Sequence, residues 1–137
     1  MKELSPVDWA KRPLQHYADF EGRSPRSEYW WFQLFQWLAY VGLSFVFGIL
    51  GAIAGMGIGL VFAVIILLAI GLFIPNLACM IRRLHDQDHS GWMCLLFFIP
   101  YVGGIVAIVF MCIRGTQGAN KYGPDPLSEE HLEEVFA

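Results

Sequence analysis

The sequence predicts an all-α integral membrane protein, a small bundle of three transmembrane helices with an N-terminal interfacial helix. Hydrophobic residues make up 56% of the 137-residue chain and charged residues only 15%, against roughly 25% charged residues in soluble domains. Residues 29–81 contain no Asp, Glu, Lys, Arg or His, and crossing a bilayer takes roughly 20 apolar helical residues. A second uncharged stretch, residues 90–113, is long enough for one more crossing.

Residues 1–28 are expected to form an interfacial amphipathic arm. Ser5 followed by Pro6 is typical of a helix start, with Ser as the cap and Pro in the first turn. Pro13 is expected to kink or split this helix. Lys11 and Arg12 lie off the apolar face, which suits a helix in the headgroup region; the residues of that face are Val7, Ala10, Leu14, Tyr17 and Ala18. The alternative is a mobile polar arm.

Residues 29–113 form the predicted transmembrane bundle. The first span is expected over residues 29–50, because Ser24-Pro25 repeats the signal for a helix start. Glycines at 51, 55 and 59 predict either a turn near residues 51–57, which we favour, or a small-xxx-small packing motif. The second span is expected over residues 58–79, followed by a charged loop over residues 82–89. The amides of Gln33, Gln36 and Asn76 are expected to form hydrogen bonds between the spans.

The third span is expected over residues 92–113. Pro100, Gly103 and Gly104 interrupt this stretch, so it is a kinked helix or, as the alternative, a broken or re-entrant hairpin. Each arm of such a hairpin would have about 8 to 10 residues and reach about 12 to 15 Å, half the thickness of a bilayer. We therefore expect one kinked span.

The basic residues predict the orientation of the chain in the bilayer. Seven of the nine lie in the arm or after the second span: Lys2, Lys11, Arg12, Arg23, Arg26, Arg82 and Arg83. Since basic residues are retained on the cytoplasmic side, the N-terminus is expected there. Three spans place the polar, acidic tail of residues 114–137 outside, whereas a hairpin places all the basic residues inside.

Two charged clusters flank the first two spans. The simplest interpretation is a set of interfacial ion pairs, with Glu28 and Asp86 paired to arginines. The alternative is an anion site that binds a lipid phosphate through four converging guanidinium groups, those of Arg23, Arg26, Arg82 and Arg83. His85 and His89 are a weak metal motif, and we expect no metal and no cofactor. The glycine-rich start of the tail is expected to fold back as a cap over the bundle end.

Three clusters together resemble the YhaH-like family of small bacterial inner-membrane proteins of unknown function (DUF805), over roughly residues 9–127. The first cluster comprises Phe20, Gly22, Arg23, Arg26, Glu28, Tyr29 and Trp30. The second comprises Arg82, Arg83, His85, Asp86, Ser90, Gly91 and Trp92. The third comprises Gly115, Gly118, Asn120, Tyr122, Gly123, Asp125 and Pro126. The resemblance implies a multi-pass protein of the bacterial inner membrane and brings no reaction, ligand or catalytic residue.

These observations favour a non-enzymatic interaction or regulatory membrane protein. The alternative is a protein that binds anionic lipid at the arginine cluster. Hydrolase, transferase and phosphate-loop motifs are not found in the sequence, and it carries no sustained basic surface for nucleic acid. The expected partner is the lipid bilayer. Anionic phospholipid, a second copy of the chain and another membrane protein are further candidates.

Overall fold

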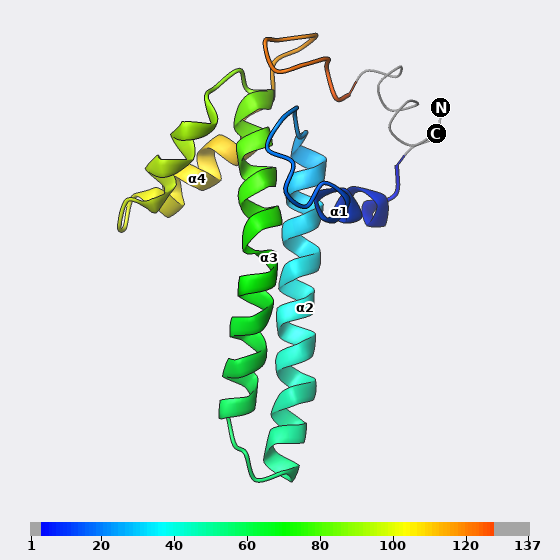
Figure 1. Cartoon of the computed structure of the whole chain (residues 1–137), viewed down its shortest axis with the longest axis vertical. Coiled ribbons are helices and arrows are strands. Elements are labelled where there is room, and N and C mark those ends of the chain that lie inside the picture. The colour runs from blue at the N-terminus through cyan, green and yellow to red at the C-terminus, as the bar shows by residue number, and fades with distance from the viewer. Residues whose placement is uncertain (1–3, 128–137) are drawn as a thin grey trace.

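The computed structural model describes residues 4–127, which fold into helices joined by short turns. In chain order these are α1 (Pro6–Gln15), α2 (Arg26–Ile53), α3 (Gly59–Asp86), the 3-10 helix η1 (Gly91–Phe98) and α4 (Gly103–Cys112). Figure 1 shows α2 and α3 as a long antiparallel pair, with the other elements gathered around one end of it. We call this the closed end. The all-α prediction is therefore confirmed for the described residues.

Helix α1 lies across α2 near the closed end (Figure 1). Ser5 and Asp8 form a reciprocal capping box at its start, as Ser and an acidic residue at this spacing favour. The helix runs through Pro13 to Gln15 as one element, so the expected split does not occur. The packed face also differs from the prediction, because Arg12 is buried while Val7 and Leu14 are exposed.

A tight turn joins α2 to α3 at the far end of the pair. The backbone N–H groups of Met56 and Gly57 both donate to the carbonyl of Gly51, at 2.9 and 3.2 Å. Gly55 and Gly57 have φ of 70° and 60°, which glycine adopts without steric cost. The favoured interpretation of this glycine-rich stretch, a turn between antiparallel helices, is thus confirmed.

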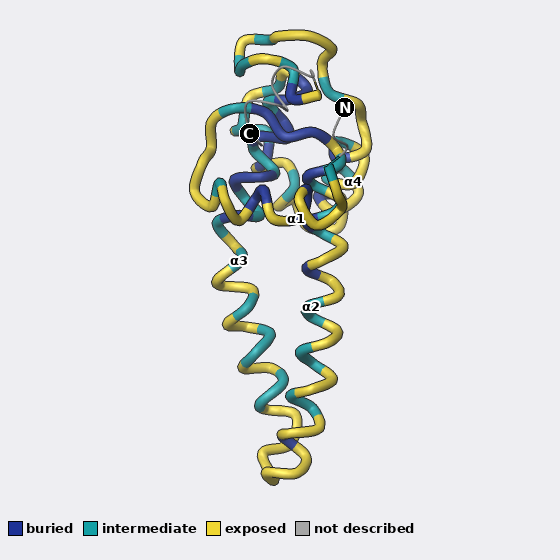
Figure 2. The backbone as a smooth tube through the Cα atoms, turned by 90° about the vertical axis from the view of Figure 1, so that its right-hand side faces the viewer, coloured by how far each residue is buried: buried dark blue, intermediate teal, exposed yellow. Residues whose placement is uncertain are grey.

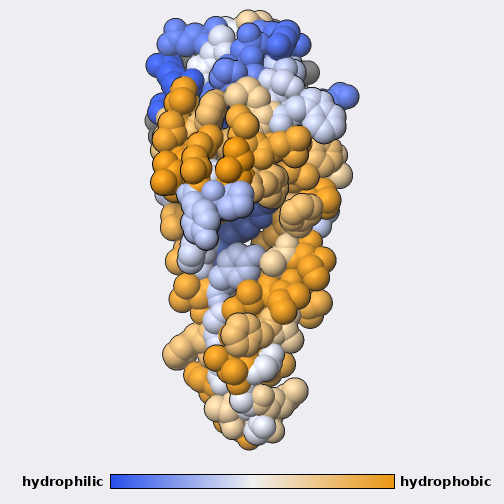
Figure 3. All heavy atoms as spheres, turned by 90° about the vertical axis from the view of Figure 1, so that its left-hand side faces the viewer, coloured by the Kyte–Doolittle hydropathy of each residue, from blue (hydrophilic) through white to orange (hydrophobic). Residues whose placement is uncertain are grey.

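The long helices expose most of their apolar side chains. Only 11% of the most apolar window of α2 and 6% of that of α3 is buried within the chain, and Figure 2 shows the long pair mostly exposed or intermediate below the closed end. Figure 3 shows the resulting apolar band under a hydrophilic end. At 1.5 Å per residue, 28 residues span about 42 Å, more than the roughly 30 Å hydrocarbon core. Both helices are therefore long and apolar enough to cross a membrane.

The stretch expected to be a third span does not form one continuous helix. It folds into η1 and α4, which pack against each other and against α3. Pro100 has no N–H to continue a helix, and Tyr101 adopts a φ of 65°. At Gly103 a Cβ would collide with the carbonyl of Phe97, so the return is tight. The structure corresponds to the alternative, a broken hairpin, which brings Cys112 back to the closed end.

The predicted charged loop over residues 82–89 is also shorter than expected. Helix α3 continues to Asp86, and the turn begins at Gln87. Arg83 and Asp86 form an ion pair one turn apart along the helix at 2.6 Å, and basic side chains favour the last turn of a helix. The second charged cluster therefore lies on a helix, whose direction fixes where its side chains point.

Candidate functional site

The closed end contains a buried cluster of six charged side chains, which we call the ion-pair cluster. Its members come from α1, from the segment before α2, from the first turn of α2 and from the last turns of α3: Arg12, Arg23, Glu28, Arg82, Arg83 and Asp86. All six are buried. Because an isolated buried charge is costly, each of these groups needs an ionic or hydrogen-bonding partner.

Glu28 joins α1, α2 and α3. Its side chain is fully buried, and its two carboxylate oxygens lie 3.4 Å from Nη1 of Arg12 and 3.2 Å from Nη2 of Arg82. Arg12 comes from α1 and Arg82 from α3. One carboxylate thus links α1 and α3 to α2.

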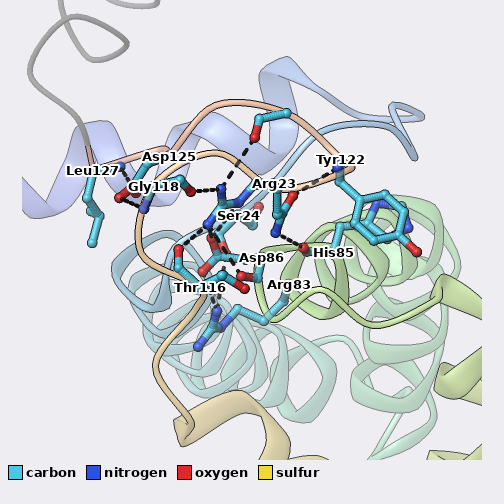
Figure 4. A network of polar contacts seen from close by, with 12 residues as sticks. Arg23, Ser24, Arg83, His85, Asp86, Thr116, Gly118, Tyr122, Asp125 and Leu127 are labelled. Carbon is cyan, nitrogen blue, oxygen red and sulfur yellow. Dashed lines mark hydrogen bonds and ion pairs between the residues drawn. The ribbon is translucent and has the colours of Figure 1, made fainter.

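Asp86 pairs with two arginines in the same way. Its Oδ1 lies 3.0 Å from Nε and Nη2 of Arg23, and its Oδ2 lies 2.6 Å from Nη1 of Arg83. Figure 4 shows the guanidinium of Arg23 between Asp86 and the returning chain. The forked geometry of a guanidinium suits this combination of carboxylate and carbonyl acceptors.

The chain that follows α4 closes over Arg23 and Asp86. Arg23 donates to the carbonyls of Thr116 and Gly118, the latter at 2.6 Å, and Thr116 N donates to the carbonyl of Asp86 at 2.7 Å. A Cβ at Gly115 would fall on the Asp86 carboxylate. Glycine is therefore required for this close approach, and the third sequence cluster meets the first two.

The end of α4 accepts hydrogen bonds from side chains at the closed end of the long helices. Arg83 donates to the carbonyl of Ile113, Gln87 to that of Phe110, and Arg26 to that of Cys112 at 3.3 Å. These carbonyls lie at the end of α4 and just beyond it, where helical hydrogen bonds run out. Side chains from α2 and α3 thus cap the second arm of the hairpin.

The start of the tail is a folded-back cap, as expected. Asn120 Nδ2 donates to the carbonyl of His85 at 2.9 Å, and Asn120 and Gly123 pair through their backbones. Burial by itself raises the pKa of Asp125. The hydrogen bonds that its carboxylate accepts from the backbone N–H groups of Leu127 and Gly118 lower the pKa by more, so the net shift is downward. Pro126 is buried beneath this cap. Residues 128–137, the acidic end of the predicted tail, lie outside the described residues.

A second group of cluster residues lies apart from the ion pairs. His85 and Tyr122 stack with ring centroids 4.0 Å apart and an angle of 5° between the rings (Figure 4). They sit at one end of a groove of about 550 Å³ between α3 and η1. Ser90, Gly91 and Trp92 line the same groove, and the Ser90 side chain caps η1. The polar residues of the second and third clusters therefore lie at two separate places, the ion-pair cluster and this groove.

The remaining cluster residues pack around this end. Tyr29 packs against the small core formed by Leu84, Cys94 and Met111, and Trp30 donates from Nε1 to the carbonyl of Met111 at 3.3 Å. Gly22 adopts a φ of 83° and offers its carbonyl to His85. Phe20 and Arg26 are exposed.

Three amides form a second polar cluster, within the apolar part of the long helices. Asn76 Oδ1 accepts hydrogen bonds from Gln33 at 3.0 Å and Gln36 at 2.9 Å, and Asn76 Nδ2 donates to Gln36 at 2.7 Å. The predicted interhelical role of these amides is confirmed. Such bonds satisfy polar groups that lipid cannot.

Sequence reasoning missed Arg12 as a member of the ion-pair cluster. Its place beside Lys11 suggested a solvated face, and nothing local indicates that Glu28 draws it inward. Gln87 and Thr116 were also missed, because their partners are backbone groups far away in the sequence.

The four arginines of the alternative lipid-phosphate site do not converge on a free site. Arg23, Arg82 and Arg83 are buried and point to carboxylates or carbonyls of the chain itself. Arg26 alone of the four is exposed. Among residues 4–127, no group of three or more His, Cys, Asp or Glu side chains is arranged to hold a metal ion.

Comparison with known proteins identifies the family. Residues 17–124 match the family described as "Protein of unknown function (DUF805)". The chain belongs to the DUF805 family. Inner membrane protein YhaH of Escherichia coli K12 is 40% identical over 127 residues, covering 90% of this chain and 99% of that protein. Inner membrane protein YhaI of the same strain is 42% identical over 120 residues, covering 88% and 96%. No solved structure gives a significant match.

The DUF805 region contains most of the ion-pair cluster. Arg23, Glu28, Arg82, Arg83 and Asp86 all fall within the matched range, as does the folded-back segment up to Gly123. Arg12 lies before that range. The family region is thus the two long helices, the broken hairpin and the chain that returns over Asp86.

Proposed function

We propose that this DUF805 protein is a non-enzymatic interaction protein of the bacterial inner membrane. It binds another membrane protein, a second copy of itself included, through the apolar faces of α2 and α3. The ion-pair cluster serves to hold these helices in one fixed arrangement. The N-terminus and the described part of the tail lie on the cytoplasmic side in this proposal.

The observation that carries the proposal is a contrast along the helix pair. Buried ion pairs hold the closed end, whereas the rest of the described chain leaves the apolar side chains of α2 and α3 exposed. The buried carboxylates Glu28 and Asp86 are engaged by arginines, so they are suited to positioning rather than to proton transfer. Below them the large side chains of α2 and α3 are exposed, among them Trp37, Phe45, Leu67 and Ile70. Two helices alone offer a wide surface for packing against further helices in lipid.

Binding of anionic lipid at the arginine cluster has less support. Its strongest remaining feature is Arg26, which lines a cavity of about 100 Å³ together with Arg114. Asp86 and Asp125 line the same cavity, and their charge opposes a phosphate there. The interaction role is therefore the one we propose.

Site-specific photo-crosslinking in intact cells tests the interaction role. A photoreactive amino acid is placed in turn at each position from 37 to 49 of α2. A packed interface gives protein adducts that recur with the period of a helix, about every 3.6 residues, with Leu38, Val41 and Phe45 on one exposed face. Mass analysis of the adducts distinguishes a second copy from another protein. Absence of protein adducts at every position would overturn the proposal.

A further inference from the structure

The groove between α3 and η1 has the size and build of a ligand site. Its volume of about 550 Å³ lies within the roughly 300–1,000 Å³ of small-molecule pockets. One wall comes from α3 and the other from η1, and the apolar side chains that form them are Phe73, Leu77, Ile81, Leu95 and Phe98. Leu95 and Phe98 are exposed, so the groove is open along one side.

The polar end of the groove presents one oriented acceptor. Nδ1 of His85 lies 3.1 Å from the carbonyl of Gly22. A carbonyl only accepts, so Nδ1 carries the hydrogen, and Nε2 of the neutral ring is an acceptor. Stacking on Tyr122 fixes the plane of the ring. Within residues 4–127 no hydrogen bond to Nε2 is found.

Glycine at position 91 keeps the space beside this nitrogen. A Cβ there would lie 3.3 Å from Nε2 of His85 and 2.7 Å from Cγ2 of Ile81. Gly91 itself lines the groove. The start of η1 therefore approaches α3 closely while leaving the acceptor uncovered by a side chain.

The charge of the groove indicates the kind of head group. Its lining contains no Asp, Glu, Lys or Arg, whereas the groove beneath α1 includes Lys11. Neither an anionic nor a cationic head group finds a countercharge among the lining residues; Lys121, whose Nζ lies 5.1 Å from the centroid of the Tyr122 ring, is exposed and outside that lining. An uncharged head that donates a hydrogen bond complements the His85 acceptor and the apolar walls.

We propose that this groove binds a neutral lipid alcohol from the membrane. Its hydroxyl group donates to Nε2 of His85, and its apolar chain lies along α3 and η1. Entry is lateral, from the lipid that surrounds the exposed side of η1. The site is separate from the ion-pair cluster and from the face of α2 tested by crosslinking. The lipid-binding proposal can therefore be tested independently of the proposed interaction role.

Native mass spectrometry of the full-length protein, delipidated in mild detergent, tests the site with dioleoylglycerol as the probe. Saturable binding is expected. The same lipid with its hydroxyl acetylated, and dioleoyl phosphatidic acid, are each expected to bind about tenfold more weakly, the equivalent of about 1.4 kcal/mol. Equal binding of the alcohol and the acetylated lipid, or preference for phosphatidic acid, would overturn the proposal.

Two variants separate the acceptor from the groove. His85→Asn keeps a donor near the Gly22 carbonyl but removes Nε2, and is expected to lower the affinity for dioleoylglycerol about tenfold. Leu95→Trp fills the groove and is expected to abolish binding. Ile105→Trp, at an exposed position of α4 outside the groove, is the matched control and should bind as the unaltered chain does. Unchanged binding by Leu95→Trp, with its thermal unfolding also unchanged, would exclude the groove even where His85→Asn fails to fold.

Discussion

Two buried carboxylates determine how the closed end is held together. Glu28 and Asp86 each form ion pairs with two arginines, and the arginines come from different parts of the chain. Taking such charges out of water costs about as much as their attraction returns. The pairs therefore contribute geometry more than net stability. Removal of one partner is a different matter, because it leaves the other charges buried without compensation.

Asp86→Asn is expected to destabilise the fold strongly. The substitution leaves Arg23 and Arg83 buried without their carboxylate, which lowers the free energy of unfolding by about 3 kcal/mol or more. Asp88→Asn is the matched control: Asp88 is exposed with a φ of 60°, a conformation that Asn tolerates, so a change within about 0.5 kcal/mol is expected. Thermal unfolding of both variants in detergent measures the difference, and equal stability would refute the role given to Asp86.

Gly115→Ala is expected to loosen the returning chain. The added methyl group would collide with the Asp86 carboxylate, so the chain around Thr116 must move away from Arg23. Gly104→Ala adds the same methyl group inside α4, where it meets nothing within 4 Å; it should be neutral or stabilise by about 0.5 kcal/mol. Limited proteolysis between α4 and the tail, measured as the rate of cleavage, distinguishes the two. Equal cleavage rates would show that the close approach is not needed.

At the scale of the elements, the sequence predicted what depends on local composition. The uncharged stretch and the glycines near Gly51 were sufficient to predict two long helices and the turn between them. The third apolar stretch was harder, because its composition allows one kinked span or a hairpin, and the short arms of a hairpin favoured the span. In the hairpin the end of α4 contacts Arg26 and Arg83, and such a long-range contact leaves no local pattern.

The amide cluster is expected to stabilise the pairing of α2 with α3. Asn76→Leu leaves the amides of Gln33 and Gln36 without their shared partner, and a loss of about 1 kcal/mol is expected, as for other hydrogen bonds between membrane helices. The triple variant Gln33→Leu, Gln36→Leu, Asn76→Leu removes every polar group at once and should recover part of this loss. Reversible unfolding in detergent or bicelles measures both, and a triple variant weaker than the single one would contradict the argument.

At the scale of the molecule, the sequence predicted that charged groups pair at this end of the helices, but not all the groups that each of them contacts. Acids and bases near the ends of two spans predicted ion pairs involving Glu28 and Asp86. That Arg23 also binds the carbonyls of Thr116 and Gly118 depends on the chain returning after α4. The three-span prediction placed the tail on the opposite side of the membrane from Arg23, so it excluded this contact. The wrong prediction for one element therefore left the contacts of Thr116 and Gly118 out of the predicted site.

The structure therefore predicts that both ends of the described chain lie on the same side of the membrane. Described basic residues from α1, α2, α3 and the returning chain gather at the closed end, while the turn over residues 54–58 carries none. By the retention of basic residues we expect that side to be the cytoplasm. A fluorescent protein that matures only in the cytoplasm should therefore fluoresce when it is fused to the C-terminus. Alkaline phosphatase inserted at Met56 should be active. Phosphatase activity at the C-terminus would require the broken hairpin to cross the bilayer and would separate Thr116 from Arg23.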